Sequence, residues 1–263
     1  MRINKVFKKL CITIILMLLL SNYITYRLTK YVMENKMTKI EQNVSINAEK
    51  DETANIAEER FGIDPNKVKD IKNVMIVAHP DDETLWGGKN LLDEKYLVIC
   101  LTNGDNEVRK KEFLNVMKET DDYGIILNYP DKVNNVKSDW KGDKEKIRKD
   151  ISYILTYKKW DKIVTHNPEG EYGHIHHKLT NNMVTEECIK KNLTNQLMYF
   201  SRYYKKNVLS EKKLEYTLSD KESDIKNQIM QDIYKSQNYA YESFKHMIPY
   251  EKFISYKNWN YEI

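Results

Sequence analysis

Short apolar runs alternate with helix-like segments through the middle of the chain. The runs span residues 74–78, 96–101, 125–127, 162–165 and 197–200, and their scarcity of polar side chains is typical of buried parallel strands. Four segments between them place apolar side chains at helical spacing: 84–92, 109–122, 142–158 and 178–190. Strands that alternate with helices predict an α/β domain in which a mostly parallel sheet carries helices on both faces.

The N-terminus combines basic residues with a long apolar stretch. Four basic residues precede the apolar run 10–20: Arg2, Lys5, Lys8 and Lys9. Residues 6–26 provide about the 20 residues that a spanning helix needs, and no A-x-A cleavage site follows, so we predict a signal anchor with a transmembrane helix within residues 1–28. A cleaved signal peptide and a buried helix of a soluble protein are the alternatives. Because the basic residues come first, we expect a single-pass cell-membrane protein with its domain outside the cytoplasm, or a secreted one if the N-terminus is cleaved.

Composition divides the rest of the chain and limits its partners. Residues 29–69 are polar with mixed charges and predict a stalk or linker, whereas residues 70–263 hold the strand-like runs and form the predicted domain. The 43 Lys and Arg against 39 Asp and Glu leave a net charge of only +4, which gives no reason to expect a nucleic-acid partner. The three cysteines lack CxxC spacing, so neither a thiolate metal site nor a disulfide framework is indicated.

Two of the predicted strands are followed by residues that suit metal chemistry. The first run ends in His79-Pro80-Asp81-Asp82-Glu83, and the fourth is followed by a loop and a helix start that carries three histidines. Among these, His174 and His177 are three residues apart and therefore share a helix face. In a parallel sheet ligands collect at the carboxyl ends of the strands, so the two clusters are expected to face one site.

One imidazole of the second cluster would complete a His-Asp-His set with His79 and Asp82. Such a set suits a catalytic zinc ion, because three protein ligands leave a coordination position open. The neighbouring carboxylate of Asp81 could then accept a proton. Each cluster also has a structural interpretation, the carboxylates as charges that complement a helix dipole and the histidines as a polar surface patch. Their joint position at strand ends of one sheet favours the functional interpretation.

The same residues resemble a known family. Residues 78–83, Ala-His-Pro-Asp-Asp-Glu, match the AHPDDE signature of the LmbE-like deacetylases, which include N-acetylglucosaminyl-phosphatidylinositol de-N-acetylase (PIG-L), and residues 172–177 resemble the family's Y-G-H-x-x-H motif. Weaker similarities lie in four places: Thr102-Asn103-Gly104, Arg109-Lys110-Lys111-Glu112, Asn128-Tyr129-Pro130-Asp131 and Tyr234-Lys235-Ser236-Gln237. The resemblance covers roughly residues 70–240 and implies a Rossmann-like fold and a metal-dependent N-acetylglucosaminide deacetylase, an amide hydrolase.

The resemblance implies a metal set and a base. His79, Asp82 and His177 would hold Zn²⁺, and Asp81 would be the general base. Amide hydrolysis needs an activated water, a stabilised oxyanion and a protonated leaving nitrogen, so these roles agree with the chemistry.

The resemblance also implies residues on the substrate side. His174 would stabilise the tetrahedral oxyanion or protonate the leaving amine, with Tyr172 assisting at the carbonyl oxygen. Arg109 and Asp131 would contact sugar hydroxyls.

The chain departs from the family pattern at two points. Only four residues separate Gly104 from Arg109, where many relatives have a longer loop, and this predicts a more open substrate rim. The Pro-Asp often found between the two motif histidines is missing, so His176 competes with His177 for the ligand role. The three-residue spacing from His174 and the family motif both favour His177.

We therefore expect a zinc-dependent hydrolase that removes the N-acetyl group from an N-acetylglucosamine-type sugar in an extracytoplasmic glycan or glycolipid. A non-catalytic carbohydrate-binding protein on the same fold is one alternative, but a binding module needs neither Asp81 nor a full His-Asp-His set. A cytosol-facing deacetylase of a small glucosaminide is the other, and the apolar N-terminus argues against it.

Overall fold

The computed structural model describes residues 2–212 and 214–261, and within its first helix the side chains of residues 2–6, 11–12, 14–15, 41–51 and 53 lie outside this description. Internal contacts divide the chain into two units, Met1–Glu52 and Thr53–Ile263. Residues 53–69, which the sequence analysis assigned to the stalk, pack within the second unit, where Ala57, Ile63 and Val68 are buried. The division of the chain at residues 28 and 69 stays a prediction.

The N-terminal segment forms helix α1 (Arg2–Phe61). Over the described residues, no helix is both long and apolar enough to cross a membrane. The described residues therefore do not support the transmembrane helix expected at residues 6–26. Part of that expectation rests on residues 6, 11, 12, 14 and 15, whose side chains lie outside the description.

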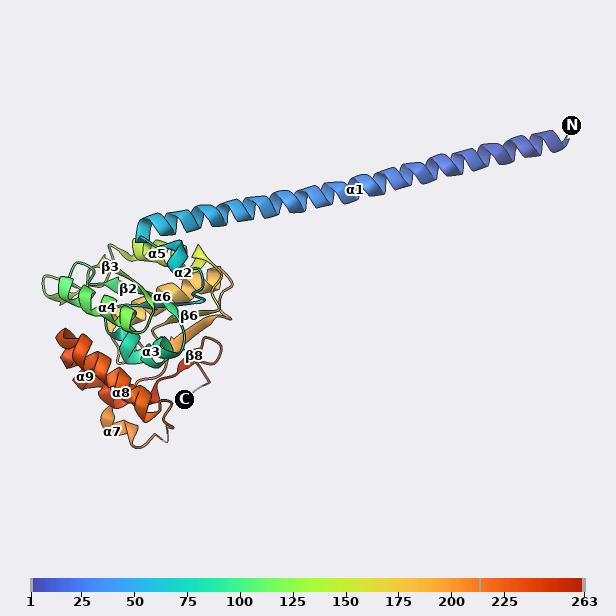
Figure 1. Cartoon of the computed structure of the whole chain (residues 1–263). Helices are drawn as coiled ribbons and strands as arrows, with labels where there is room; N and C mark the ends of the chain where they lie inside the picture. Colours follow the sequence, from blue (N-terminus) through green and yellow to red (C-terminus); the bar gives the residue numbers. More distant parts are fainter. Residues whose placement is uncertain (1, 213, 262–263) are drawn as a thin grey trace. The chain divides into compact units, whose positions relative to one another are not determined.

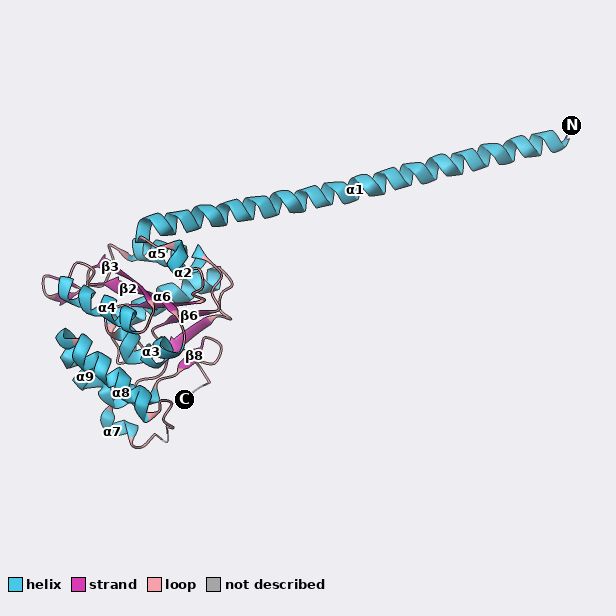
Figure 2. Cartoon of the chain, viewed as in Figure 1, coloured by secondary structure: helices cyan, strands magenta, loops and turns pink. Residues whose placement is uncertain are grey.

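A six-stranded sheet forms the centre of the second unit, in the order β3-β2-β1-β6-β7-β8. Its strands are magenta in Figure 2. They are β1 (Asn73–Val77), β2 (Tyr96–Thr102), β3 (Tyr123–Tyr129), β6 (Lys162–Thr165), β7 (Leu197–Phe200) and β8 (Phe253–Ser255). The first five pair in parallel, with Met75 of β1 opposite Val98 of β2 and Val164 of β6, whereas β8 runs antiparallel to β7. The predicted mostly parallel α/β sheet is confirmed.

Helices cover both faces of this sheet (Figure 1). They are α2 (Pro65–Val68), α3 (Asp82–Asp93), α4 (Glu107–Glu119), α5 (Lys144–Tyr157), α6 (Ile175–Lys190), α7 (Lys206–Leu209), α8 (Asp220–Gln228) and α9 (Asn238–Phe244). Alternate residues of β1 point to opposite faces, so Val74 and Ile76 pack with α5 and α6, and Met75 and Val77 pack with α3 and α4. Each face therefore has its own apolar core.

The C-terminal part of the chain covers the α3–α4 face. After α8 it continues as a π-helical turn (Ile229–Ile233), a 3-10 turn (Lys235–Gln237), α9 and a second 3-10 turn (Lys245–Tyr250) before it enters the sheet as β8. Buried Lys226 of α8 donates to Glu251 at 2.5 Å and to the carbonyl oxygen of Leu85 in α3 at 2.9 Å. These contacts hold the tail against the helix that begins at the first sequence motif.

The strand order creates a switch point at β1. From β1, the chain continues to β2 and β3 on one side, and returns to β6 and β7 on the other. A crevice forms at such a point outside the carboxyl ends of the strands, and ligands of open α/β sheets bind there. Both sequence motifs follow the strands that meet at this position, β1 and β6.

Candidate active site

The first motif forms a tight turn between β1 and α3. Asp82 accepts the backbone N–H of His79 through Oδ2 at 2.8 Å, which closes the turn. Asp81 has a φ of 111°, a strained value for a residue with a side chain, and its N–H donates to Glu83 Oε2 at 3.1 Å. Glu83 is itself held by the hydroxyl of Tyr234 at 2.6 Å. A buried network thus fixes Asp81 in a conformation that the backbone alone would avoid.

The second motif forms the loop between β6 and α6. Gly170 and Gly173 have φ values of 68° and 92°, which glycine adopts without strain, and they turn the chain towards the helix. His174 is the N-cap of α6, and its Nδ1 accepts the backbone N–H of His176 at 3.3 Å. The helix then presents His176 and His177 on buried positions of its first turn.

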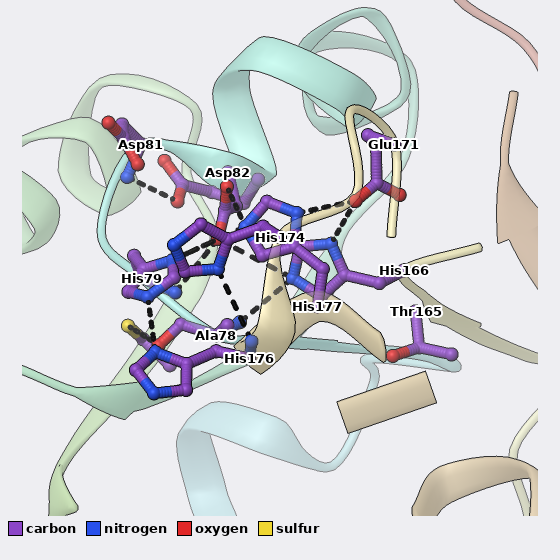
Figure 3. Close-up of polar contacts among 12 residues, drawn as sticks. Ala78, His79, Asp81, Asp82, Thr165, His166, Glu171, His174, His176 and His177 are labelled. Atoms are coloured by element: carbon purple, nitrogen blue, oxygen red, sulfur yellow. Dashed lines mark hydrogen bonds and ion pairs between the residues drawn. The ribbon is translucent and has the colours of Figure 1, made fainter. Parts of the chain in front are cut away.

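His79, Asp82 and His177 converge on one point (Figure 3). His79 Nδ1 lies 3.1 Å from Asp82 Oδ2, His177 Nε2 lies 3.3 Å from His79 Nδ1, and His177 Nε2 lies 3.2 Å from Asp82 Oδ1. Metal bonds of 2.0–2.1 Å in a tetrahedral site separate the ligand atoms by about 3.3–3.4 Å. The two imidazole nitrogens and the Asp82 carboxylate, which faces each nitrogen with a different oxygen, therefore lie close enough to hold a single small divalent ion, and this donor set suits zinc.

The hydrogen bonds of His176 show which ring nitrogen of His79 is available to a metal. The carbonyl oxygen of Ser138 can only accept, so His176 Nε2, at 2.7 Å, carries a proton, and in the neutral ring Nδ1 is an acceptor. Burial lowers the pKa of His176 to about 4, which keeps this ring neutral. His176 Nδ1 then accepts the Nε2–H of His79 at 3.0 Å. The Nδ1 atom of His79 is left facing Asp82 and His177.

Glu171 assigns the free nitrogen of His177 in the same way. Its Oε2 lies 2.5 Å from His177 Nδ1 and 3.0 Å from His166 Nδ1, so it accepts a proton from both rings (Figure 3). Burial acts to raise the pKa of Glu171, but its interactions with His166 and His177 outweigh it and lower the pKa to about 2. A carboxylate on one imidazole nitrogen turns the other towards a metal and strengthens it as a ligand. For His177 that nitrogen is Nε2, the atom beside Asp82.

The described residues also form three other groups of potential ligands: His79 with His174 and His177, His79 with Asp131 and His176, and Asp82 with His166 and His177. The last two each contain a nitrogen that is already used. The His176 Nδ1 accepts from His79, and the His166 Nε2 accepts the backbone N–H of Ala78 at 2.9 Å. Both rings therefore support their neighbours, and His79, Asp82 and His177 remain the best set.

His174 also lies close to these ligands but is oriented as a donor. Because its Nδ1 accepts a backbone N–H, the neutral ring carries its proton on Nε2. Burial, followed by the charges of His79 and His177, lowers the pKa of His174 to about 2, so the ring stays neutral. It offers an N–H to a ligand in the cleft.

Acidic groups outnumber cations around this point. Asp81, Asp82, Glu83 and Glu171 are all buried, and Arg109 is the guanidinium beside them, with Nη2 3.6 Å from Asp81 Oδ1. Burial raises the pKa of Asp81 well above its usual range, although the charge of Arg109 opposes this. Buried carboxylates without enough cationic partners favour a bound metal ion, whose charge also favours the ionised form of Asp81.

A cleft of about 250 Å³ opens above the three converging donors. Its lining includes every residue that the family resemblance assigned to catalysis or substrate: Asp81, Arg109, Asp131, Tyr172 and His174. Lys132 and Lys137 of the small hairpin formed by β4 (Lys132–Val133) and β5 (Val136–Lys137) lie on one rim, and the C-terminal segment contributes Gln237, Tyr239 and Phe244. Their catalytic and binding roles stay predictions, but the structure places all five in one site.

Three of these side chains have further contacts that bear on their roles. Arg109 donates to the carbonyl oxygen of Pro80 at 2.6 Å, so it also holds the first motif in place. Asp131 Oδ1 lies 3.5 Å from His79 Nε2, and it is half-buried at the cleft wall. Tyr172 stacks on Phe244 at 4.4 Å, and burial raises the pKa of its hydroxyl, which therefore remains a donor.

Sequence reasoning missed several residues of this site. His166 and Glu171 were given no role, although His166 directly follows β6 and five of the six histidines gather here. Trp140 stacks on His176, with ring centroids 4.3 Å apart and an angle of 3° between the ring planes. It was missed because nothing in its local sequence pattern marks it. Of these three residues, only His166 could have been found from the sequence, because it lies directly at the end of a predicted strand.

Comparison with known proteins agrees with this geometry. Residues 74–188 match the model of the family PIG-L, described as GlcNAc-PI de-N-acetylase. An uncharacterized protein of Acanthamoeba polyphaga mimivirus is 33% identical over 122 residues, a match that covers 40% of this chain and 52% of that protein. This chain thus spans about half the length of that relative. The matched segment contains both histidine motifs. It includes all of β1 except its first residue, the start of α3 and the loop before α6. The recognition made from the sequence is confirmed: residues 74–188 form a domain of the PIG-L family, whose members are deacetylase-type hydrolases.

Proposed function

We propose that this protein is a zinc-dependent hydrolase that removes the N-acetyl group from an N-acetylglucosamine-type sugar of a glycan or glycolipid. The observation that carries the proposal is the convergence of donor atoms of His79, Asp82 and His177 beside the unligated carboxylate of Asp81. The family to which residues 74–188 belong supports the deacetylase class.

The metal fits the donor set, and when bound it supplies a Lewis acid and an acidified water. Asp81 is held by its neighbours at the edge of the cleft, where its carboxylate orients the attacking water and accepts its proton. As the new C–O bond forms and the amide C–N bond breaks, that proton is available to the leaving nitrogen. The products are acetate and a free sugar amine.

Two side chains are placed to stabilise negative charge on the carbonyl oxygen. The neutral His174 ring would offer its Nε2–H and Tyr172 its hydroxyl, since both residues line the cleft. Because the pKa of His174 is lowered to about 2, donation of a hydrogen bond to the oxyanion suits this residue better than transfer of a full proton. Asp131 and Arg109 also line the cleft, where they would contact sugar hydroxyls.

The extracytoplasmic location expected from the N-terminal charge pattern stays a prediction. The proposed chemistry does not depend on it, because the metal site and the cleft are built within residues 53–263.

Acetate release from an N-acetylglucosamine glycoside by the full chain tests the proposal. We expect stoichiometric acetate and free amine from the zinc-loaded protein, loss of both after chelation, and recovery when Zn²⁺ is added back. Binding of the glycoside without acetate release at any metal loading would instead identify a non-catalytic carbohydrate-binding protein.

A further inference from the structure

A second hollow opens beside the catalytic cleft at the carboxyl ends of β2 and β3. Its volume is about 800 Å³, and it shares Arg109, Asp131, Lys132 and Gln237 with the cleft. The cleft alone, at about 250 Å³, falls just below the approximately 300–1,000 Å³ of ordinary ligand pockets. It has room for a single N-acetyl sugar, whereas the two spaces together have room for a longer ligand.

The short connection between β2 and α4 leaves this hollow open. After Thr102, Asn103 takes a φ of 68°, and the N–H of Gly104 donates to the carbonyl oxygen of Leu127 at 2.9 Å. A Cβ at Gly104 would lie 2.1 Å from Asn128 Oδ1, so only glycine lets the loop lie this close to β3. Helix α4 begins at Glu107, and the few residues in between leave no loop long enough to cover the space. This side of the hollow is therefore left uncovered.

The chemistry of the lining indicates what the hollow can bind. Two carboxylates, Asp105 and Asp131, balance two cations, Arg109 and Lys132. Most other lining residues are amides: Asn103, Asn106, Asn128 and Gln237. One aromatic ring, Tyr129, is present, and its hydroxyl already donates to Asp150. A surface rich in donors and acceptors, without net charge and with little apolar area, suits an uncharged ligand rich in hydroxyl groups and disfavours an acyl chain or a polyanion.

We propose that this hollow binds the sugar units next to the one that is deacetylated, so that the substrate is a neutral oligosaccharide or polysaccharide and not a single lipid-linked sugar. The proposal rests on the deacetylase function proposed above, and narrows it from glycan or glycolipid to glycan. The cleft holds the reacting N-acetyl sugar, and the shared residues Arg109 and Asp131 mark where the chain passes into the hollow.

The dependence of kcat/KM on substrate length tests this inference. For methyl glycosides of one to four β-1,4-linked N-acetylglucosamine units, we expect kcat/KM to rise at least about tenfold from monomer to tetramer, the gain that two additional hydrogen bonds give. Asp105→Trp fills the hollow from an exposed side chain that forms no hydrogen bond or ion pair with any described residue, and it should bring the tetramer-to-monomer ratio close to one. Val108→Trp is the matched control, because Val108 is 58% exposed and does not line the hollow.

A tetramer-to-monomer ratio near one in the wild type, or the same ratio in the Asp105 and Val108 variants, would overturn the inference and leave the deacetylase function standing. If the zinc-loaded protein releases acetate from no oligomer, the deacetylase function fails instead. Calorimetric measurement of monomer and tetramer binding then tests whether the hollow binds additional sugar units. Tighter binding of the tetramer that Asp105→Trp abolishes supports it, and equal binding overturns it.

Discussion

His177→Ala is expected to abolish both metal binding and deacetylase activity, whereas His176→Ala should retain the metal. The Nε2 of His177 lies within 3.3 Å of both other proposed ligands, and its Nδ1 is fixed by Glu171. His176 instead has one nitrogen bound to Ser138 and the other to His79, so its loss removes a support and not a ligand. Because the metal supplies several kcal/mol of transition-state stabilisation, we expect the rate of His177→Ala to fall by at least about 10³-fold.

Metal content per chain and acetate release, measured on the same samples, give the result. We expect about one zinc per chain in the wild type and in His176→Ala, and almost none in His177→Ala. His246→Ala serves as the histidine control, since His246 donates to the carbonyl oxygen of Tyr204 and belongs to none of the candidate ligand groups. If His176→Ala lost the metal and His177→Ala kept it, the ligand would be His176 and not His177.

Asp81→Asn should retain the metal and lose most of the activity. The side chain keeps its size, but an amide cannot accept the proton of the attacking water, and loss of a general base typically costs about 10²–10⁴-fold in rate. Asp81 is next to Asp82, yet its carboxylate faces Arg109 and lines the cleft, so metal content should stay near one per chain. The fall should appear in kcat, with KM for the glycoside changed little.

Asp93→Asn, at the far end of α3, is the matched control and should keep the wild-type rate. A thermal melt of both variants separates a catalytic loss from a folding defect. Wild-type turnover by a folded, metal-loaded Asp81→Asn protein would mean that another group is the base.

The sequence contained enough information for the sheet and for the two motifs. Runs such as 74–78 and 96–101 are apolar on both faces because both sides of the sheet are covered, and this makes them recognisable without a tertiary structure. The His-x-x-Asp spacing of His79 and Asp82 is closed by a local hydrogen bond, so the pairing of these two residues was predictable from neighbours in the chain.

Contacts between distant segments were not predictable. Strand β8 has three residues, and its pairing with β7 depends on a tail that first packs over α3 and α4. Tyr234 reaches Glu83 across 151 positions of sequence, and nothing local to either residue indicates it. At the N-terminus, a basic cluster followed by Leu-rich sequence suggested a transmembrane helix, which the described residues do not support.

The position of bound zinc in crystals of the full chain, located by anomalous scattering, tests the metal-centred mechanism most directly. We expect one peak within bonding distance of His79 Nδ1, Asp82 and His177 Nε2, with Asp81 beside the ion and not bound to it. A peak between His79 Nε2, Asp131 and His176, or no peak in crystals that hold excess zinc, would contradict the ligand set and the mechanism built on it.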